Sequence, residues 1–143
     1  MKTERRNIFF NGLRIFGGLL EFFLLLTLYL RIENLGDAVI YAATWVTFIH
    51  LCIGEYVLVR YCDAQSMLQD SLDLLAYIFL VCGSMVFVSA PLWCAFFGGL
   101  FALAVVKYLV VIRTASDPDL QKYAKEKVVW EMPAVIVLAV LAI

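Results

Sequence analysis

Long apolar stretches alternate with short polar segments along the whole chain. A bilayer core of about 30 Å is crossed by roughly 20 helical residues. Five stretches meet or approach that length and predict transmembrane helices over about residues 8–30, 38–59, 71–90, 92–112 and 128–143. The predicted fold is therefore an all-α polytopic membrane protein, in which residues 1–143 form a single bundle of about five transmembrane helices.

The third and fourth stretches are separated only by Ser89, Ala90 and Pro91. One unbroken helix over both would be about 63 Å long, twice the thickness of the hydrocarbon core. Pro91 favours a turn, because the residue before a proline tends to leave the helical region and proline suits the start of a new helix. We expect a tight hairpin between the third and fourth helices.

The fifth stretch is preceded by a helix start signal. Ser116 or Asp117 can cap the helix, with Pro118 in its first turn. The helix should run through a basic segment before it becomes apolar, and Pro133 should kink it. Its apolar part has only about 16 residues, fewer than a bilayer core requires, and the sequence stops at Ile143 without a polar tail. We interpret this either as a short helix or as a truncation within a longer protein.

Composition supports a membrane protein. Apolar residues make up 64% of the 143 residues and charged residues 16%, whereas soluble domains have about 45–50% and 25%. These values exclude an ordinary soluble domain and a disordered chain. The net charge of −1 offers no basic surface to a nucleic acid. The four cysteines form no CxxC motif, and Cys62, just after the second stretch, is a candidate for S-acylation.

Lysine and arginine residues predict the orientation, because they concentrate in cytoplasmic loops. With the N-terminus inside, Arg31 is alone on the outside. The residues on the inside are Lys2, Arg5, Arg6, Arg60, Arg113, Lys122, Lys125 and Lys127. The N-terminus is therefore predicted to be cytoplasmic, and five crossings put the C-terminus on the opposite side.

Five ionisable residues within the apolar stretches form a predicted charge band near the cytoplasmic side. Helical rise places all of them within roughly 9 Å of that side. They are Arg14, Glu55, Asp73, Lys107 and Glu131. The band could be the entrance of an ion pathway, or its members could snorkel to the interface and pair with one another to fix helix packing.

Glu21 and His50 lie deeper, at about 20 Å and 15 Å from the cytoplasmic side, too far to snorkel. Ionisable groups at that depth are expensive and commonly functional. We expect the two side chains to meet across the first two helices, either as a proton relay or as a neutral hydrogen bond that fixes helix packing.

No catalytic or metal-binding motif is present in the sequence, and no cofactor is expected. We expect a small channel or transporter for protons, ions or a small solute, built from several copies because five short helices can hardly enclose a pore. One alternative is a non-catalytic accessory or assembly subunit of a larger membrane complex. A second is a membrane-embedded enzyme that acts on a lipid through Glu55, Asp73 or His50. The expected partners are the bilayer and either further copies or a larger complex, with no nucleic acid.

Overall fold

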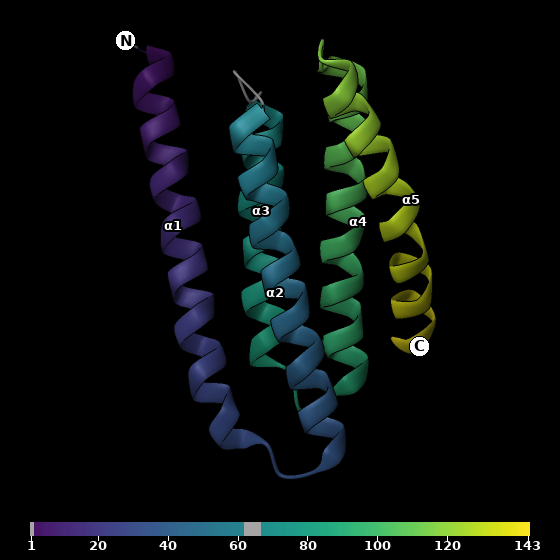
Figure 1. Cartoon of the computed structure of the whole chain (residues 1–143). Helices are drawn as coiled ribbons and strands as arrows, with labels where there is room; N and C mark the ends of the chain where they lie inside the picture. The colour runs from purple at the N-terminus through teal and green to yellow at the C-terminus, as the bar shows by residue number, and fades with distance from the viewer. Residues whose placement is uncertain (1, 62–66) are drawn as a thin grey trace.

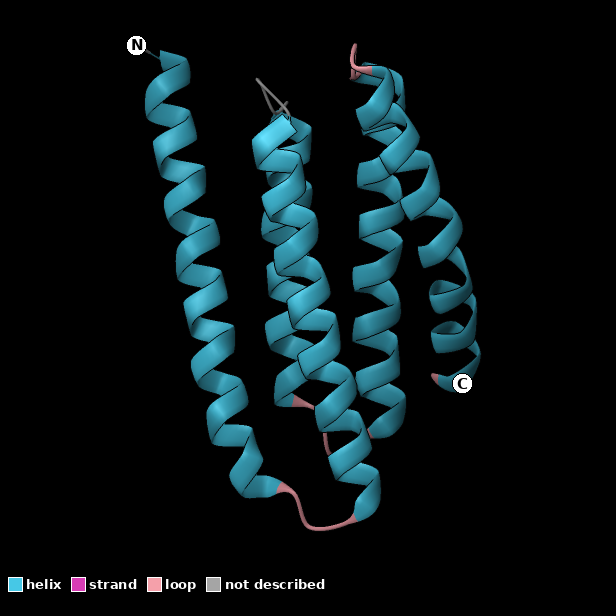
Figure 2. Cartoon of the chain, viewed as in Figure 1, coloured by secondary structure: helices cyan, strands magenta, loops and turns pink. Residues whose placement is uncertain are grey.

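The computed structural model describes residues 2–61 and 67–143, and the side chains within 9–56 and 68–143. This part of the chain forms α-helices and one short 3₁₀ helix, and it contains no strand (Figures 1 and 2). The α-helices are α1 (Lys2–Leu28), α2 (Leu35–Tyr61), α3 (Met67–Met85), α4 (Ala90–Thr114) and α5 (Pro118–Leu141). The 3₁₀ helix η1 (Tyr29–Arg31) extends α1. Cys62 lies outside the described residues.

Consecutive helices run in alternating directions along one axis (Figure 1). The N-terminus, the end of α2 and the turn between α4 and α5 lie at one end of the bundle. The connections from α1 to α2 and from α3 to α4 lie at the other end. α3 packs against α1 and α4, and α5 packs along α4. The predicted all-helical architecture is confirmed.

Within the part of the chain that the structure describes, four helical segments are long and apolar enough to cross a membrane. They are Phe9–Arg31, Leu35–Tyr56, Leu68–Met85 and Ala90–Thr114. α5 forms as a continuous helix but is not among them. Its first three turns are rich in charged residues, so the apolar part is short. The bundle therefore supports four of the five predicted crossings by length and composition.

The hairpin between α3 and α4 is confirmed, but it lies earlier in the chain than predicted. α3 ends at Met85, and the Ser89 N–H donates to the Val86 carbonyl at 2.9 Å to close the turn. Ala90 begins α4 and was wrongly assigned to the preceding helix. Pro91 lies in the first turn of α4, where backbone N–H groups have no helical acceptor, so the proline removes no hydrogen bond there.

The start of α5 is formed as the sequence predicts. The Asp117 carboxylate accepts a hydrogen bond from the Asp119 backbone N–H at 2.9 Å, and Pro118 is the first helical residue. The helix continues through Pro133, and its ribbon curves along α4 (Figure 1). A proline within a helix removes one backbone hydrogen bond and bends the axis. α5 therefore follows α4 along a curved path.

Aromatic side chains dominate the centre of the bundle. Trp93 stacks on Phe97 with ring centroids 4.4 Å apart. The Trp93 indole N–H donates to the hydroxyl of Thr44 on α2 at 2.9 Å, which satisfies a polar group that is expensive to bury alone. The outward surface is also apolar: Phe16 on α1 and Ile136 on α5 are both more than 60% exposed. Apolar surface on both the inside and the outside is typical of a helix bundle surrounded by lipid.

Candidate functional site

An ion-pair network joins four helices near the end of the bundle that carries the N-terminus. Arg14 on α1 lies at its centre. Its guanidinium donates to Asp70 and Asp73 of α3 at 2.9 and 2.7 Å. The Arg14 Nε atom also lies 3.3 Å from the carboxylate of Glu55 on α2. One arginine thus contacts carboxylates from two other helices.

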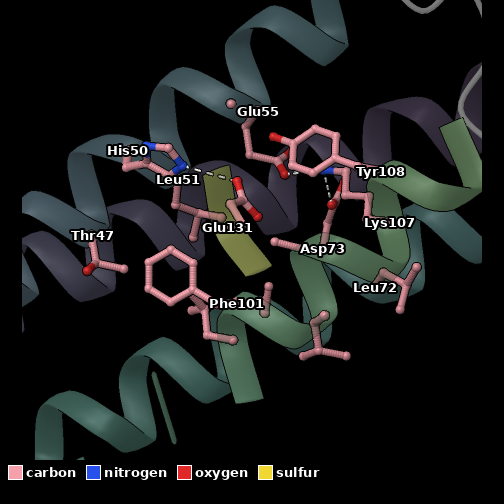
Figure 3. A pocket seen from close by; sticks show the side chains of 15 residues that line it. Thr47, His50, Leu51, Glu55, Leu72, Asp73, Phe101, Lys107, Tyr108 and Glu131 are labelled. Carbon is pink, nitrogen blue, oxygen red and sulfur yellow. Dashed lines mark hydrogen bonds and ion pairs between the residues drawn. The ribbon is translucent and has the colours of Figure 1, made fainter. Parts of the chain in front are cut away.

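Lys107 closes the network from α4. Its ammonium forms ion pairs with Glu55 and Asp73 (Figure 3). Lys107, Glu55 and Asp73 are all buried. Charges removed from water need paired partners, and here each cation has at least two carboxylates. We call Arg14, Glu55, Asp70, Asp73 and Lys107 the four-helix ion network; its formal charge is −1, from two cations and three anions.

The predicted charge band divides into two sites. Its members Arg14, Glu55, Asp73 and Lys107 all belong to the four-helix ion network. Asp70 is an additional member, because it lies one helical turn before Asp73 and on the same face of α3. Glu131 instead has its ion-pair contact with His50.

His50 on α2 lies between two charged side chains of α5. Its Nε2 atom is 3.2 Å from Glu131 Oε1 and 3.1 Å from Lys127 Nζ. Lys127 and Glu131 are four residues apart, so both reach the same side of α5. Glu131 is buried, whereas the His50 side chain is 41% exposed. We call Lys127, His50 and Glu131 the His50 triad.

The two contacts at His50 Nε2 require different protonation states of that nitrogen. Without a hydrogen, Nε2 accepts from the Lys127 ammonium; with a hydrogen, it donates to Glu131. Both partners are within hydrogen-bond distance of the same atom, so the ring need not turn over to change partner. Partial burial lowers the pKa of Lys127, and the Glu131 carboxylate opposes that shift. Lys127 therefore releases its proton more readily than a lysine in water does.

The His50 triad lies between a cleft and a smaller cavity. The cleft, about 350 Å³ in volume, is lined by charged and aromatic residues. They are His50, Phe101, Tyr123, Glu126, Lys127, Trp130 and Glu131. The smaller cavity has a volume of about 30 Å³. Figure 3 shows the Glu131 side chain beside it, with His50 on one side and Lys107 and Tyr108 on the other. His50 and Glu131 line both spaces. Of the two, only the smaller cavity is lined by Glu55, Asp73 and Lys107.

The smaller cavity has the size and polarity to hold water. A cavity of about 10–15 Å³ can hold one water molecule when polar partners are present. Glu131 Oε2 is buried and has no hydrogen-bond partner among the described residues. An unsatisfied buried oxygen beside such a cavity is the usual position for a bridging water. One or two waters would connect the His50 triad to the four-helix ion network.

Glu21 and His50 do not meet, and the expected contact between them is wrong. Glu21 is completely buried on α1 and accepts a hydrogen bond from the Ser84 hydroxyl of α3 at 2.5 Å. The reason is the direction in which α1 packs. Gly17, one turn before Glu21, lies against the Tyr77 ring of α3, so that face of α1 is turned toward α3. Glu21 Oε2 has no hydrogen-bond partner among the described residues.

Three contributing residues were not among the predicted site residues: Asp70, Ser84 and Lys127. Lys127 had a usable signal, since it precedes Glu131 by four residues in a predicted helix. Ser84 had none, because a serine within a helix is common and its partner is distant in sequence. Among the described residues no group of three or more His, Cys, Asp or Glu side chains is arranged to hold a metal ion.

Comparisons with models of protein families, with curated proteins and with solved structures give no match to this chain. The site therefore has to be interpreted from its own geometry. It combines the four-helix ion network, in which each charged side chain is ion-paired, with the adjoining His50 triad, which lines the cleft.

Proposed function

We propose that this protein is a small integral membrane transporter that moves protons, or a small solute together with protons, through the interior of its helix bundle. In this proposal the N-terminus is cytoplasmic, and α5 completes a fifth crossing that puts the C-terminus on the opposite side. The excess of lysine and arginine in the segments assigned to the inside supports the orientation.

The single observation that carries the proposal is the position of His50 and Glu131 between the cleft and the smaller cavity. Ionisable side chains that face the interior of a membrane bundle commonly belong to proton or ion pathways. His50 is half-exposed on the cleft side, and the Glu131 carboxylate is buried on the cavity side. This arrangement would let the pair take a proton from the cleft and pass it to the cavity.

A proton would move through the site in two transfers. Nε2 of His50 first accepts a proton from Lys127 or from water in the cleft. The Nε2–H then donates to Glu131 Oε1, which lies 3.2 Å away. Loss of that proton to Glu131 leaves Nε2 free to accept the next one, and the protonated Glu131 carboxyl then releases its proton to water in the smaller cavity.

This pathway lies within one chain, so it does not require a pore on a symmetry axis. Association into a homo-oligomer or a larger membrane complex is a separate part of the proposal. It is supported by the large apolar side chains exposed on α1 and α5, such as Phe16 and Ile136. Lipid covers such surfaces equally well, and the oligomeric state in mild detergent distinguishes the two.

A non-catalytic accessory subunit is the second candidate, favoured by the four-helix ion network. The network ties α1, α2, α3 and α4 together, and all of its charges are paired with one another. Paired charges of this kind fix the register and orientation of helices. If this were the only role of the buried charges, the protein would assemble correctly and carry no flux.

Proton flux into liposomes tests the two candidates. The full chain is reconstituted into vesicles that contain a pH-sensitive dye, and a potassium gradient with valinomycin drives proton entry. We expect potential-driven flux that falls at least tenfold in Glu131→Gln and His50→Phe. Glu33→Gln, in the exposed turn before α2, is the matched control and should retain the flux. Absence of flux from the folded wild-type chain would refute the transport proposal and favour the accessory subunit.

A further inference from the structure

The cleft beside the His50 triad combines three aromatic side chains with two carboxylates. Phe101, Tyr123 and Trp130 come from α4 and α5, and Glu126 and Glu131 come from α5. Its volume of about 350 Å³ is within the range of small-ligand sites. With His50 neutral, its lining charges are two carboxylates and the ammonium of Lys127, a formal sum of −1.

The Lys127 ammonium shows what the aromatic lining of the cleft can accommodate. Its nitrogen lies 5.8 Å from the centroid of the Tyr123 ring, which is the geometry of a cation–π contact. The flexible side chain of Lys127 thus places a cation at the rings while it also reaches His50. An organic ammonium ion entering the cleft would meet the same ring surface.

Glu131 provides a second and independent indication of a ligand. Its side chain is 4% exposed, and the Oε2 atom has no hydrogen-bond partner among the described residues. A largely buried carboxylate at the inner end of a cleft favours a positively charged or proton-donating ligand over an anion. Aromatic rings combined with carboxylates are also the usual surroundings of bound ammonium groups in proteins.

We infer that the cleft between α2, α4 and α5 binds a small substituted ammonium ion, held by the rings of Tyr123 and Trp130 and by the carboxylates of Glu126 and Glu131. This inference names the substrate class of the proposed transporter, and it rests on that proposal only for the transport step. Binding of the cation beside His50 would compete with the Lys127 ammonium and so couple ligand occupancy to the proton site.

Calorimetric titration of the detergent-solubilised full chain with choline tests the inference. Dimethylbutanol, the uncharged carbon isostere of choline, and propionate, a small anion, are the comparison ligands. We expect saturable binding of choline and at least tenfold weaker binding of dimethylbutanol, because only the cation gains from the rings and carboxylates. Equal binding of the isostere, stronger binding of propionate, or no binding of choline would each overturn the inference.

Two variants connect the binding to the cleft. Trp130→Leu keeps an apolar side chain and removes the ring, and it should weaken choline binding by about three- to thirtyfold. Glu126→Gln should weaken it by about two- to fivefold through the lost charge. Ile136→Ala, on the outward surface of the same helix, is the matched control and should bind choline like the wild type. Unchanged binding in Trp130→Leu would show that choline binds elsewhere and would overturn the assignment.

The liposome assay keeps this inference separate from the proposed function. Proton flux that depends on His50, in a protein that does not bind choline, would leave the proposed function intact and refute the ammonium site. Choline binding that is weakened by Trp130→Leu, in a protein without proton flux either in the absence or in the presence of choline, would support the ammonium site and refute the transport proposal.

Discussion

Replacement of Lys107 by methionine should strongly destabilise the bundle. Lys107 is 6% exposed and forms ion pairs with Glu55 and Asp73, which are equally inaccessible to water. Methionine has a similar length but no charge, so Lys107→Met leaves Arg14 as the only cation for three carboxylates. The formal charge of the four-helix ion network then falls from −1 to −2.

The expected cost follows from the burial of the unpaired charge. Removal of one partner from a buried ion pair typically costs about 3–5 kcal/mol, which is about two to four orders of magnitude in the unfolding equilibrium constant. A second change, Glu55→Gln, removes one of the two carboxylates that Lys107 contacts and returns the formal charge of the network to −1. The double variant should therefore be more stable than the sum of the two single effects by about 1 kcal/mol or more.

Unfolding by titration of sodium dodecyl sulfate into mixed micelles, followed by circular dichroism, measures these differences. Lys125→Met changes an exposed lysine on α5 and should stay within about 0.5 kcal/mol of the wild type. The reasoning would be refuted if Lys107→Met also stayed within about 1 kcal/mol of the wild type. Strictly additive effects in the double variant would likewise show that Lys107 and Glu55 do not act as a pair.

Three further predictions concern other parts of the chain. Ser84→Ala removes the hydrogen-bond partner of the buried Glu21 and should lower the free energy of unfolding by about 1–3 kcal/mol in the same assay. Glu21→Gln can still accept a hydrogen bond from the Ser84 hydroxyl and should lower it less. A larger loss in Glu21→Gln than in Ser84→Ala would contradict the assigned contact. A Cβ atom at Gly83 would lie 2.6 Å from the Phe97 ring, so Gly83→Ala should destabilise the bundle by about 1–3 kcal/mol. Gly12→Ala is the control and should be neutral or stabilising, because nothing lies within 4 Å of the new atom. Similar losses of stability in both variants would refute the close approach of Gly83 to Phe97. A reporter enzyme that is active only in the cytoplasm should be active when fused to the N-terminus and inactive when fused to the C-terminus. Activity at both ends would show that α5 does not cross the membrane.

Local signals in the sequence predicted the elements well, because they depend on neighbouring residues. Asp117 and Pro118 marked the start of α5 at the correct position. The predicted turn before α4 was placed too late in the chain, because Pro91 is compatible both with the position just after a turn and with the first turn of a helix. The hydrogen bond from Ser89 to Val86, which closes the turn, has no distinctive residue pattern.

The partner of a buried side chain could not be predicted from the sequence. The depth of Glu21 indicated that its side chain needs a partner on another helix, but it could not indicate which helix supplies that partner. Close approach of Gly17 to Tyr77 directs the Glu21 face of α1 to α3. Depth along the axis was more informative: Arg14, Glu55 and Lys107 were grouped from helical rise alone, and the structure brings them into one network.

In the proposed transporter, the degree of pairing separates the buried charges that hold the helices together from those that exchange protons. In the four-helix ion network, Arg14 and Lys107 each contact more than one carboxylate, so a proton or ion that enters must first break an existing pair. In the His50 triad, one nitrogen faces both a donor and an acceptor, and it can satisfy either contact without a side-chain rearrangement. Mutations in the network should therefore act first on stability. Conservative changes at His50 or Glu131 should lower proton flux with little effect on the free energy of unfolding. A transporter stabilised by the four-helix ion network would show these two different effects, whereas a non-catalytic accessory subunit would show only the effect on stability.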